Sequence, residues 1–146
     1  MTFRRVLLAG VLIATAVAGT HEAHACSCSW PPEAETVEAR QTWRLDQAKD
    51  IVTGKVVTVT AAEGYRGAHG LPAVAATLRV DKTVKGSVKG AIKLQTGFNG
   101  EDCGLAELLM NAVANDLPVT LELARIRKAP NQFWVHSCAF HRLETR

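Results

Sequence analysis

Four cysteines constrain the fold of this chain more than any other feature. They are Cys26, Cys28, Cys103 and Cys138 in a sequence of 146 residues, so two lie almost side by side and two lie far away. An even number of cysteines in an exported protein is typically oxidised to disulfides. A bridge between Cys26 and Cys28 would strain the ring that it closes. We therefore expect two long-range disulfides, and the spacing alone leaves both connectivities open.

The first 25 residues indicate export to the oxidising environment that these bridges need. Met1–Arg5 carries positive charge, Val6–Gly19 is a run of apolar and small residues with one threonine, and Ala23-His24-Ala25 resembles a signal-peptidase site. The apolar core of about 14 residues is shorter than the roughly 20 that a membrane span needs. We predict a signal peptide over residues 1–25, cleavage after Ala25, and a secreted or periplasmic protein.

Cleavage after Ala25 would make Cys26 the first residue of the mature protein. The alternative is a lipoprotein with an acylated Cys26, but Ala23-His24-Ala25 lacks the leucine that is usual before such a cysteine. A free Cys26 is therefore preferred. Its α-amine and its carbonyl oxygen can then hold one metal ion together, as a five-membered chelate.

The mature chain, residues 26–146, is long enough for one domain with one core. Hydrophobic residues make up 47% of the sequence and charged residues 21%, which is typical of globular proteins. The formal charge of +3 falls to +2 when Arg4, Arg5 and Glu22 leave with the leader, and this is too small to favour nucleic acid binding. No later segment is apolar enough for a membrane span, so we expect a soluble, exported monomer.

Runs of β-branched residues, separated by turn residues, predict a mainly β domain with one or two short helices. Five strands in one small domain favour a closed or partly closed barrel. Gly54 inside the first strand suggests a bulge, and a polar, glycine-rich loop over residues 97–104 contains Cys103. The predicted strands are residues 50–60, 73–80, 91–96, 118–127 and 133–140, and the predicted helices are residues 33–49 and 105–115.

Five short motifs follow one another in a specific order along the mature chain. They are Cys26-Ser27-Cys28, Ala48-Lys49-Asp50-Ile51-Val52, Val84-Lys85-Gly86, Cys103-Gly104 and Val135-His136-Ser137-Cys138-Ala139-Phe140. Together they resemble the amino-terminal, netrin-like domain of the tissue inhibitors of metalloproteinases, over essentially the whole mature chain. The resemblance implies a five-stranded OB-like barrel and the disulfides Cys26–Cys103 and Cys28–Cys138. Because the chain has no cysteines for the family's usual third disulfide, we expect a minimal, bacterial relative.

By this resemblance, the protein is an inhibitor of zinc metalloproteases. The α-amine and carbonyl oxygen of Cys26 would coordinate the catalytic zinc of the target, in place of the water that such sites keep in an open position. Ser27 would enter the specificity pocket of the protease, and Ser29 and Trp30 would continue along its cleft. The implied inhibitory edge comprises Cys26, Ser27, Cys28, Ser29, Trp30, Asn99, Gly100, Glu101 and Asp102.

Two other functions fit the sequence. A netrin-like binding or structural module of the cell envelope would use the disulfides only as staples. A copper- or zinc-binding protein would use Cys26-x-Cys28 and His136-x-Cys138-x-x-His141, which contain suitable ligand types. Oxidised cysteines would not ligate a metal, so disulfide formation argues against this last function.

Catalysis is not expected from any of the polar residues. Ser27 and Ser29 lack the Gly-x-Ser-x-Gly context of a serine hydrolase. Glu101 and Asp102 are adjacent carboxylates, but no nucleophile or base accompanies them in the sequence. We therefore predict a protein that is not an enzyme and that needs no cofactor of its own.

Overall fold

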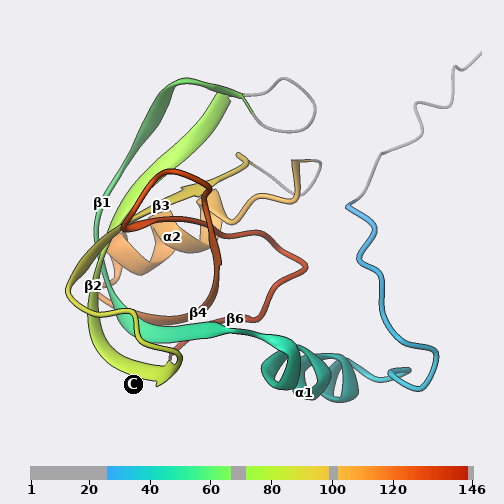
Figure 1. The fold of residues 1–146 in the computed structure, drawn as a ribbon. Coiled ribbons are helices and arrows are strands. Elements are labelled where there is room, and N and C mark those ends of the chain that lie inside the picture. The colour runs from blue at the N-terminus through green and yellow to red at the C-terminus, as the bar shows by residue number, and fades with distance from the viewer. Residues whose placement is uncertain (1–25, 67–71, 99–101, 145–146) are drawn as a thin grey trace, which may run out of the picture.

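The computed structural model describes residues 26–66, 72–98 and 102–144 (Figure 1). The predicted signal peptide and residues 99–101 of the predicted edge lie outside this part of the chain. The described elements are α1 (Val37–Gln47), β1 (Asp50–Arg66), β2 (Pro72–Lys85), β3 (Ala91–Thr96), α2 (Ala106–Ala114), β4 (Pro118–Arg125), β5 (Gln132–Trp134) and β6 (His141–Leu143).

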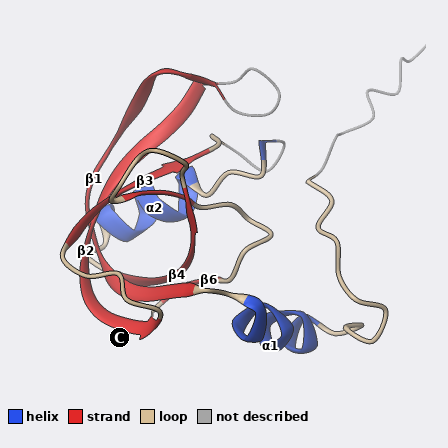
Figure 2. Cartoon of the chain, in the orientation of Figure 1, coloured by secondary structure: helices blue, strands red, loops and turns tan. Residues whose placement is uncertain are grey.

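Five of the strands form a ring, in the order β1-β2-β3-β5-β4 and back to β1. The pairing between β3 and β5 is parallel, and the other pairings in the ring are antiparallel. The short β5 completes the ring with few paired residues, so the ring is less regular than a continuous barrel. The predicted mainly β fold, with five strands that close on themselves and two short helices, is confirmed at this level (Figure 2).

The core fills the inside of the ring and follows the two-residue period of the strands. In β3, for example, Ile92 and Leu94 are buried while Lys93 between them is exposed. Helix α2 packs against β1 and β4 and adds apolar side chains from one face. The largest fully buried apolar side chains are Ile51, Val52, Leu78, Ile92, Leu94, Leu109, Val119, Leu121 and Val135.

Two of the motifs, Ala48–Val52 and Val84–Gly86, meet in the structure. The Lys85 ammonium donates to the carbonyl oxygens of Leu45 and Asp46 at 3.0 and 2.8 Å, and it thereby caps the end of α1. Gly86 has φ +86°, and a Cβ atom there would lie 2.2 Å from Asp50 Oδ1. The two motifs therefore hold α1 against the start of β1.

The buried Asp50 carboxylate links the same region to β4. Arg125 donates from Nε and Nη2 to the two oxygens of Asp50 at 3.0 and 3.1 Å. The Asp50 side chain is 6% exposed and the Arg125 side chain is 61% exposed, so water reaches this ion pair from the arginine side only. A paired arrangement of this kind satisfies a carboxylate that would be costly to bury alone.

The last predicted strand, residues 133–140, is wrong beyond Trp134. The structure ends β5 at Trp134, turns through residues 135–140, and starts the short strand β6 at His141. The Ala139 N–H donates to the His136 carbonyl at 3.0 Å, and the Phe140 N–H donates to Glu122 Oε2 at 2.8 Å. One bond within the turn and one to the distant Glu122 side chain therefore take two N–H donors that a continuous strand would give to its neighbour.

The strands β1 and β2 are longer than predicted. The predicted strands end at residue 60 and begin again at residue 73, but β1 continues to Arg66 and β2 runs from Pro72 to Lys85. Gly64 has φ +71° and lies within a break in the strand register between Ala61 and Arg66. Gly64 therefore lies in an irregular extension of the hairpin and not in a separate loop.

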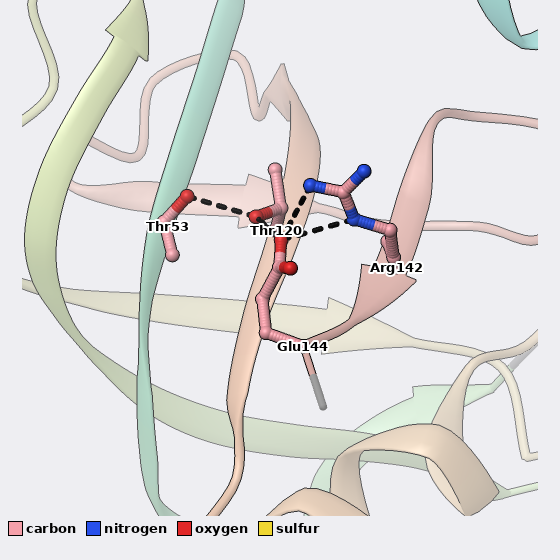
Figure 3. Close-up of polar contacts among 4 residues, drawn as sticks. All are labelled: Thr53, Thr120, Arg142 and Glu144. Atoms are coloured by element: carbon pink, nitrogen blue, oxygen red, sulfur yellow. Dashed lines mark hydrogen bonds and ion pairs between the residues drawn. The ribbon is translucent and has the colours of Figure 1, made fainter. Parts of the chain in front are cut away.

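A chain of side-chain hydrogen bonds fastens β6 to the ring (Figure 3). Thr120 Oγ1 lies 2.8 Å from Thr53 Oγ1 and donates its one proton to Glu144 Oε1, so Thr53 is the donor to Thr120. Arg142 donates to the same Glu144 oxygen from Nε and Nη2 at 3.1 and 2.9 Å. Hydrogen bonds from Thr120 and Arg142 lower the pKa of Glu144 below its ordinary value. The network therefore favours the ionised carboxylate.

Candidate functional site

Two disulfides clamp the start of the described chain to the ring. Cys26 is bonded to Cys103 and Cys28 to Cys138, with Cα–Cα distances of 5.2 and 5.3 Å. These are the two pairs that the family resemblance implies. The disulfides also touch each other, because Cys26 Sγ lies 3.8 Å from Cys138 Sγ. A segment of three residues is thus held at both ends.

The side chains of this segment alternate between the ring and solvent. Cys26, Cys28 and Trp30 are half-buried, whereas Ser27 and Ser29 are exposed. This is the alternation that an extended backbone produces. The structure therefore exposes Ser27 between two anchored cysteines.

The loop beside Cys103 is closed tightly at its base. A Cβ atom on Gly104 would lie 1.9 Å from the Gly97 carbonyl oxygen, so no larger residue fits there without movement of the backbone. Thr96 Oγ1 accepts from the buried Leu105 N–H at 2.8 Å, and the Cys103 carbonyl accepts from the Ser137 N–H at 2.8 Å. Cys103, the anchor of Cys26, is therefore fixed from both sides.

The second part of the predicted edge is only partly described. Asn99, Gly100 and Glu101 lie outside the described residues. The side chain of Asp102 is 2% exposed, so its carboxylate belongs to the interior and not to the surface of the loop. Phe98 of the same loop is 49% exposed. Sequence reasoning missed Phe98, although a large apolar residue between Gly97 and a polar stretch is a signal for a surface contact.

Trp30 turns toward helix α1. Its ring meets that of Trp43 edge-on, with centroids 6.2 Å apart and an interplanar angle of 80°. The Arg44 guanidinium lies 5.2 Å from the Trp30 centroid and 5.1 Å from the Trp43 centroid. Trp30 therefore anchors the segment that follows the two cysteines, and its half-buried ring leaves only part of its surface for a partner.

The histidines near Cys138 do not form a metal centre in the described part of the chain. All four cysteines are in disulfides and offer no thiolate. Among the described residues, no group of three or more His, Cys, Asp or Glu side chains is placed to hold a metal ion. Burial lowers the pKa of His136, the nearby Arg44 and His141 lower it further, and Glu122 opposes them. The surroundings of His136 therefore favour its neutral form.

Two disulfides are typical of proteins from oxidising compartments. In the described residues, neither helix has the length and apolar character to cross a bilayer.

No protein-family model and no curated protein matches this chain. The function must therefore be inferred from the residues and geometry of the molecule itself.

Proposed function

We propose that the mature protein begins at Cys26 and inhibits a zinc metalloprotease by chelating its catalytic metal. One observation carries the proposal: two touching disulfides hold the Cys26–Cys28 tripeptide at both ends and leave Ser27 exposed between them. The exposed segment is the part that would enter the active-site cleft. The alternating exposure of Ser27 and Ser29 supports a strand-like approach to the target.

The chemistry of the chelate comes from the terminus itself. After cleavage behind Ala25, the Cys26 α-amine and carbonyl oxygen are separated by two bonded carbons and can bind one Zn²⁺ as a five-membered ring. Only the neutral amine donates its lone pair. Because an α-amine has a pKa of about 7.7–8.0, part of it is neutral at pH 7, and metal binding releases the remaining proton.

Rigidity supports the same proposal. A flexible peptide loses conformational freedom when it enters a cleft, at a cost of roughly 0.5–1.5 kcal/mol for each immobilised side chain. The Cys26 and Cys28 side chains are already fixed by their bridges, and the Cys103 carbonyl is held in turn by the Ser137 N–H. The segment is therefore close to the rigid shape that a tight inhibitor needs.

The fold and location belong to the same proposal. We infer an OB-like, netrin-like barrel, because the five-stranded ring has non-sequential neighbours as a Greek-key barrel does. The two disulfides agree with export through a cleaved signal peptide to the periplasm or the medium. The inhibitor would act as a monomer, since one copy supplies the whole Cys26–Trp30 edge.

The test compares two versions of the secreted protein that differ at one end. The first begins at Cys26, as verified by amino-terminal sequencing, and the second has one alanine before Cys26. The first should inhibit at least one member of a panel of zinc metalloproteases and no serine protease. The second should be at least about 100-fold weaker, because the α-amine is displaced from the zinc and becomes an amide at Cys26.

A matched control carries the additional alanine after Arg146 instead. It should inhibit as well as the protein that begins at Cys26, and all three proteins should unfold at the same urea concentration. Inhibition that survives the amino-terminal alanine would refute the chelation mechanism. Absence of inhibition across the panel would refute the inhibitor function and favour a netrin-like binding module.

A further inference from the structure

A pocket of about 300 Å³ lies between helix α1 and the turn that precedes β6. Figure 1 shows α1 outside the strand ring, next to the segment that starts the described chain. The walls of the pocket are mostly apolar, with a few polar groups. Residues on its walls include Trp30, Arg40, Arg44, Ser137, Phe140 and His141. None of the functions considered above uses this pocket as a binding site.

Helix α1 contributes one face to the pocket. Val37, Arg40, Gln41 and Arg44 line it, and their spacing of three and four residues places them on the same side of the helix. No residue of α1 is fully buried, and Val37 is 61% exposed. An amphipathic helix normally packs an apolar stripe on the core. This helix instead presents two arginines and a valine to an open pocket.

The two arginines converge on one aromatic ring. The guanidinium carbons of Arg40 and Arg44 lie 5.9 and 5.2 Å from the Trp30 centroid. Arg40 is oriented by a hydrogen bond from Nε to the Ala34 carbonyl at 3.0 Å. Arg44 is oriented by its stacking against Trp43, at 5.1 Å. Both charged groups are therefore held in place on a common wall.

Neither arginine forms a salt bridge within the described part of the chain. No carboxylate there lies within 4.0 Å of either guanidinium, and the buried Arg44 Nε has no hydrogen-bond partner among the described residues. Glu122, which acts on nearby His136, accepts the Phe140 N–H and does not line the pocket. Two fixed positive charges without a counter-charge repel each other, and an anion between them would offset the repulsion.

The opposite wall adds further hydrogen-bonding groups. His141 Nδ1 lies 2.9 Å from the Ala139 carbonyl, which can only accept, so Nδ1 carries a proton and Nε2 is the second polar atom of the ring. The Ser137 hydroxyl also lines the pocket, and the Phe140 ring supplies an apolar surface. The pocket thus combines two planar cations, a hydroxyl, an imidazole and aromatic walls.

We propose that this pocket binds a carboxylate carried on a flat, apolar body. A guanidinium matches the two oxygens of a carboxylate with two parallel N–H groups. The rings of Trp30 and Phe140 suit the apolar body, and the volume suits a small molecule or one terminal residue of a peptide. The proposal does not rest on the inhibitor function, because it uses neither the Cys26 terminus nor Ser27.

Benzoate is the first probe, and benzamide is its neutral counterpart of the same shape. Binding is measured by calorimetry and by the NMR shifts of the arginine and tryptophan side-chain N–H groups. For so small a probe we expect a benzoate dissociation constant on the order of 1 mM. Benzamide should bind at least about tenfold more weakly, because it carries no charge to pair with Arg40 and Arg44.

Two variants identify the pocket. Arg44→Gln should weaken benzoate binding at least about tenfold, whereas Arg79→Gln, at an exposed arginine of β2, should leave it unchanged. Arg44→Lys keeps the charge but not the planar pair of donors, and it should give an intermediate loss. Urea unfolding of each variant shows whether the fold is intact, and Arg40→Gln serves in the same way if Arg44→Gln does not fold.

A second probe pair separates the two sources of such a carboxylate. Acetyl-Gly-Phe with a free carboxyl group represents a peptide terminus, and its carboxamide is the control. Tighter binding of the peptide than of benzoate assigns the pocket to a chain terminus, and the reverse assigns it to a free organic acid. Equal binding of the charged and neutral partners in both pairs, or no binding of either acid at 10 mM (about ten times the expected constant), would overturn the proposal.

Discussion

Replacing Cys28 and Cys138 by alanine removes one disulfide and leaves Cys26–Cys103 to close the chain alone. The two bridges span sequence separations of 77 and 110 residues. If one bridge is already present in the unfolded chain, however, the other bridge closes a much shorter loop, which is called the circuit below. That circuit runs two residues from Cys26 to Cys28 and 35 residues from Cys103 to Cys138. It is the same circuit whichever bridge is removed.

The chain-entropy relation converts this circuit into a free energy. For about 37 residues it gives a loss of about 4 kcal/mol, and the two single removals should agree within about 1 kcal/mol despite their different separations. Loss of both bridges should cost about 8 kcal/mol. Because single domains are stable by only about 5–15 kcal/mol, the protein without disulfides should be largely unfolded.

Urea unfolding, followed by tryptophan fluorescence and circular dichroism, measures these losses. The wild-type protein with a reducing agent is the matched control and should behave like the variant that lacks all four cysteines. A loss below about 1.5 kcal/mol for either bridge, or a difference above about 2 kcal/mol between them, would refute the reasoning from a shared circuit. The second result would indicate that local contacts of one disulfide, rather than the unfolded chain, dominate.

Two further predictions concern stability. Gly104→Ala should destabilise the protein by about 2 kcal/mol or more, because the new methyl group meets the Gly97 carbonyl, and an unchanged urea midpoint would show that the loop opens freely. Acidification should weaken the fold in two stages. The pKa of His136 is lowered in the folded protein, so its contribution is present above about pH 6.5 and is lost as the unfolded chain takes up the proton below that pH. The pKa of Glu144 is also lowered, so its contribution is present above about pH 4.5 and is lost at lower pH. Unfolding curves across pH for His136→Gln and Glu144→Gln should each lack one stage, and a variant that keeps both stages would contradict the assignment.

The strands could be predicted where burial follows a simple period. Residues 91–96 form β3 with the predicted bounds, because the buried Ile92 and Leu94 alternate with exposed or half-buried neighbours. The predicted bulge at Gly54 corresponds to a shift of register between Thr53 and Gly54. Residues 135–140 misled the prediction, since their apolar side chains are buried in a turn that is held by Glu122 and by the disulfide of Cys138. Long-range bonds of that kind leave no periodic trace in the sequence.

The candidate site could be predicted only in part. The Cys-x-Cys spacing predicts a stapled segment, and Ser27 is exposed as a contact residue would be. The pocket beside Trp30 had no such signal. In the sequence of the predicted helix 33–49, the apolar residues Ala34, Val37, Leu45 and Ala48 are only loosely periodic, and Trp43 lies off their stripe. In the structure, α1 buries no residue fully and directs Trp43 to Trp30. A helix without a core-facing stripe cannot be placed from hydrophobic periodicity alone.

The stapled segment and the pocket are built from the same two pieces of chain. Cys28 and Trp30 lie two residues apart, so the residue that forms one disulfide also fixes the tryptophan that forms one wall of the pocket. On the other side, Cys138 belongs to the turn that contributes Phe140 and His141 to the opposite wall. The Cys28–Cys138 bridge therefore joins the two walls directly, whereas Cys26–Cys103 joins the start of the described chain to Cys103, which does not line the pocket. An occupant of the pocket would therefore contact Trp30, which lies three residues from Ser27 on the same disulfide-bonded segment.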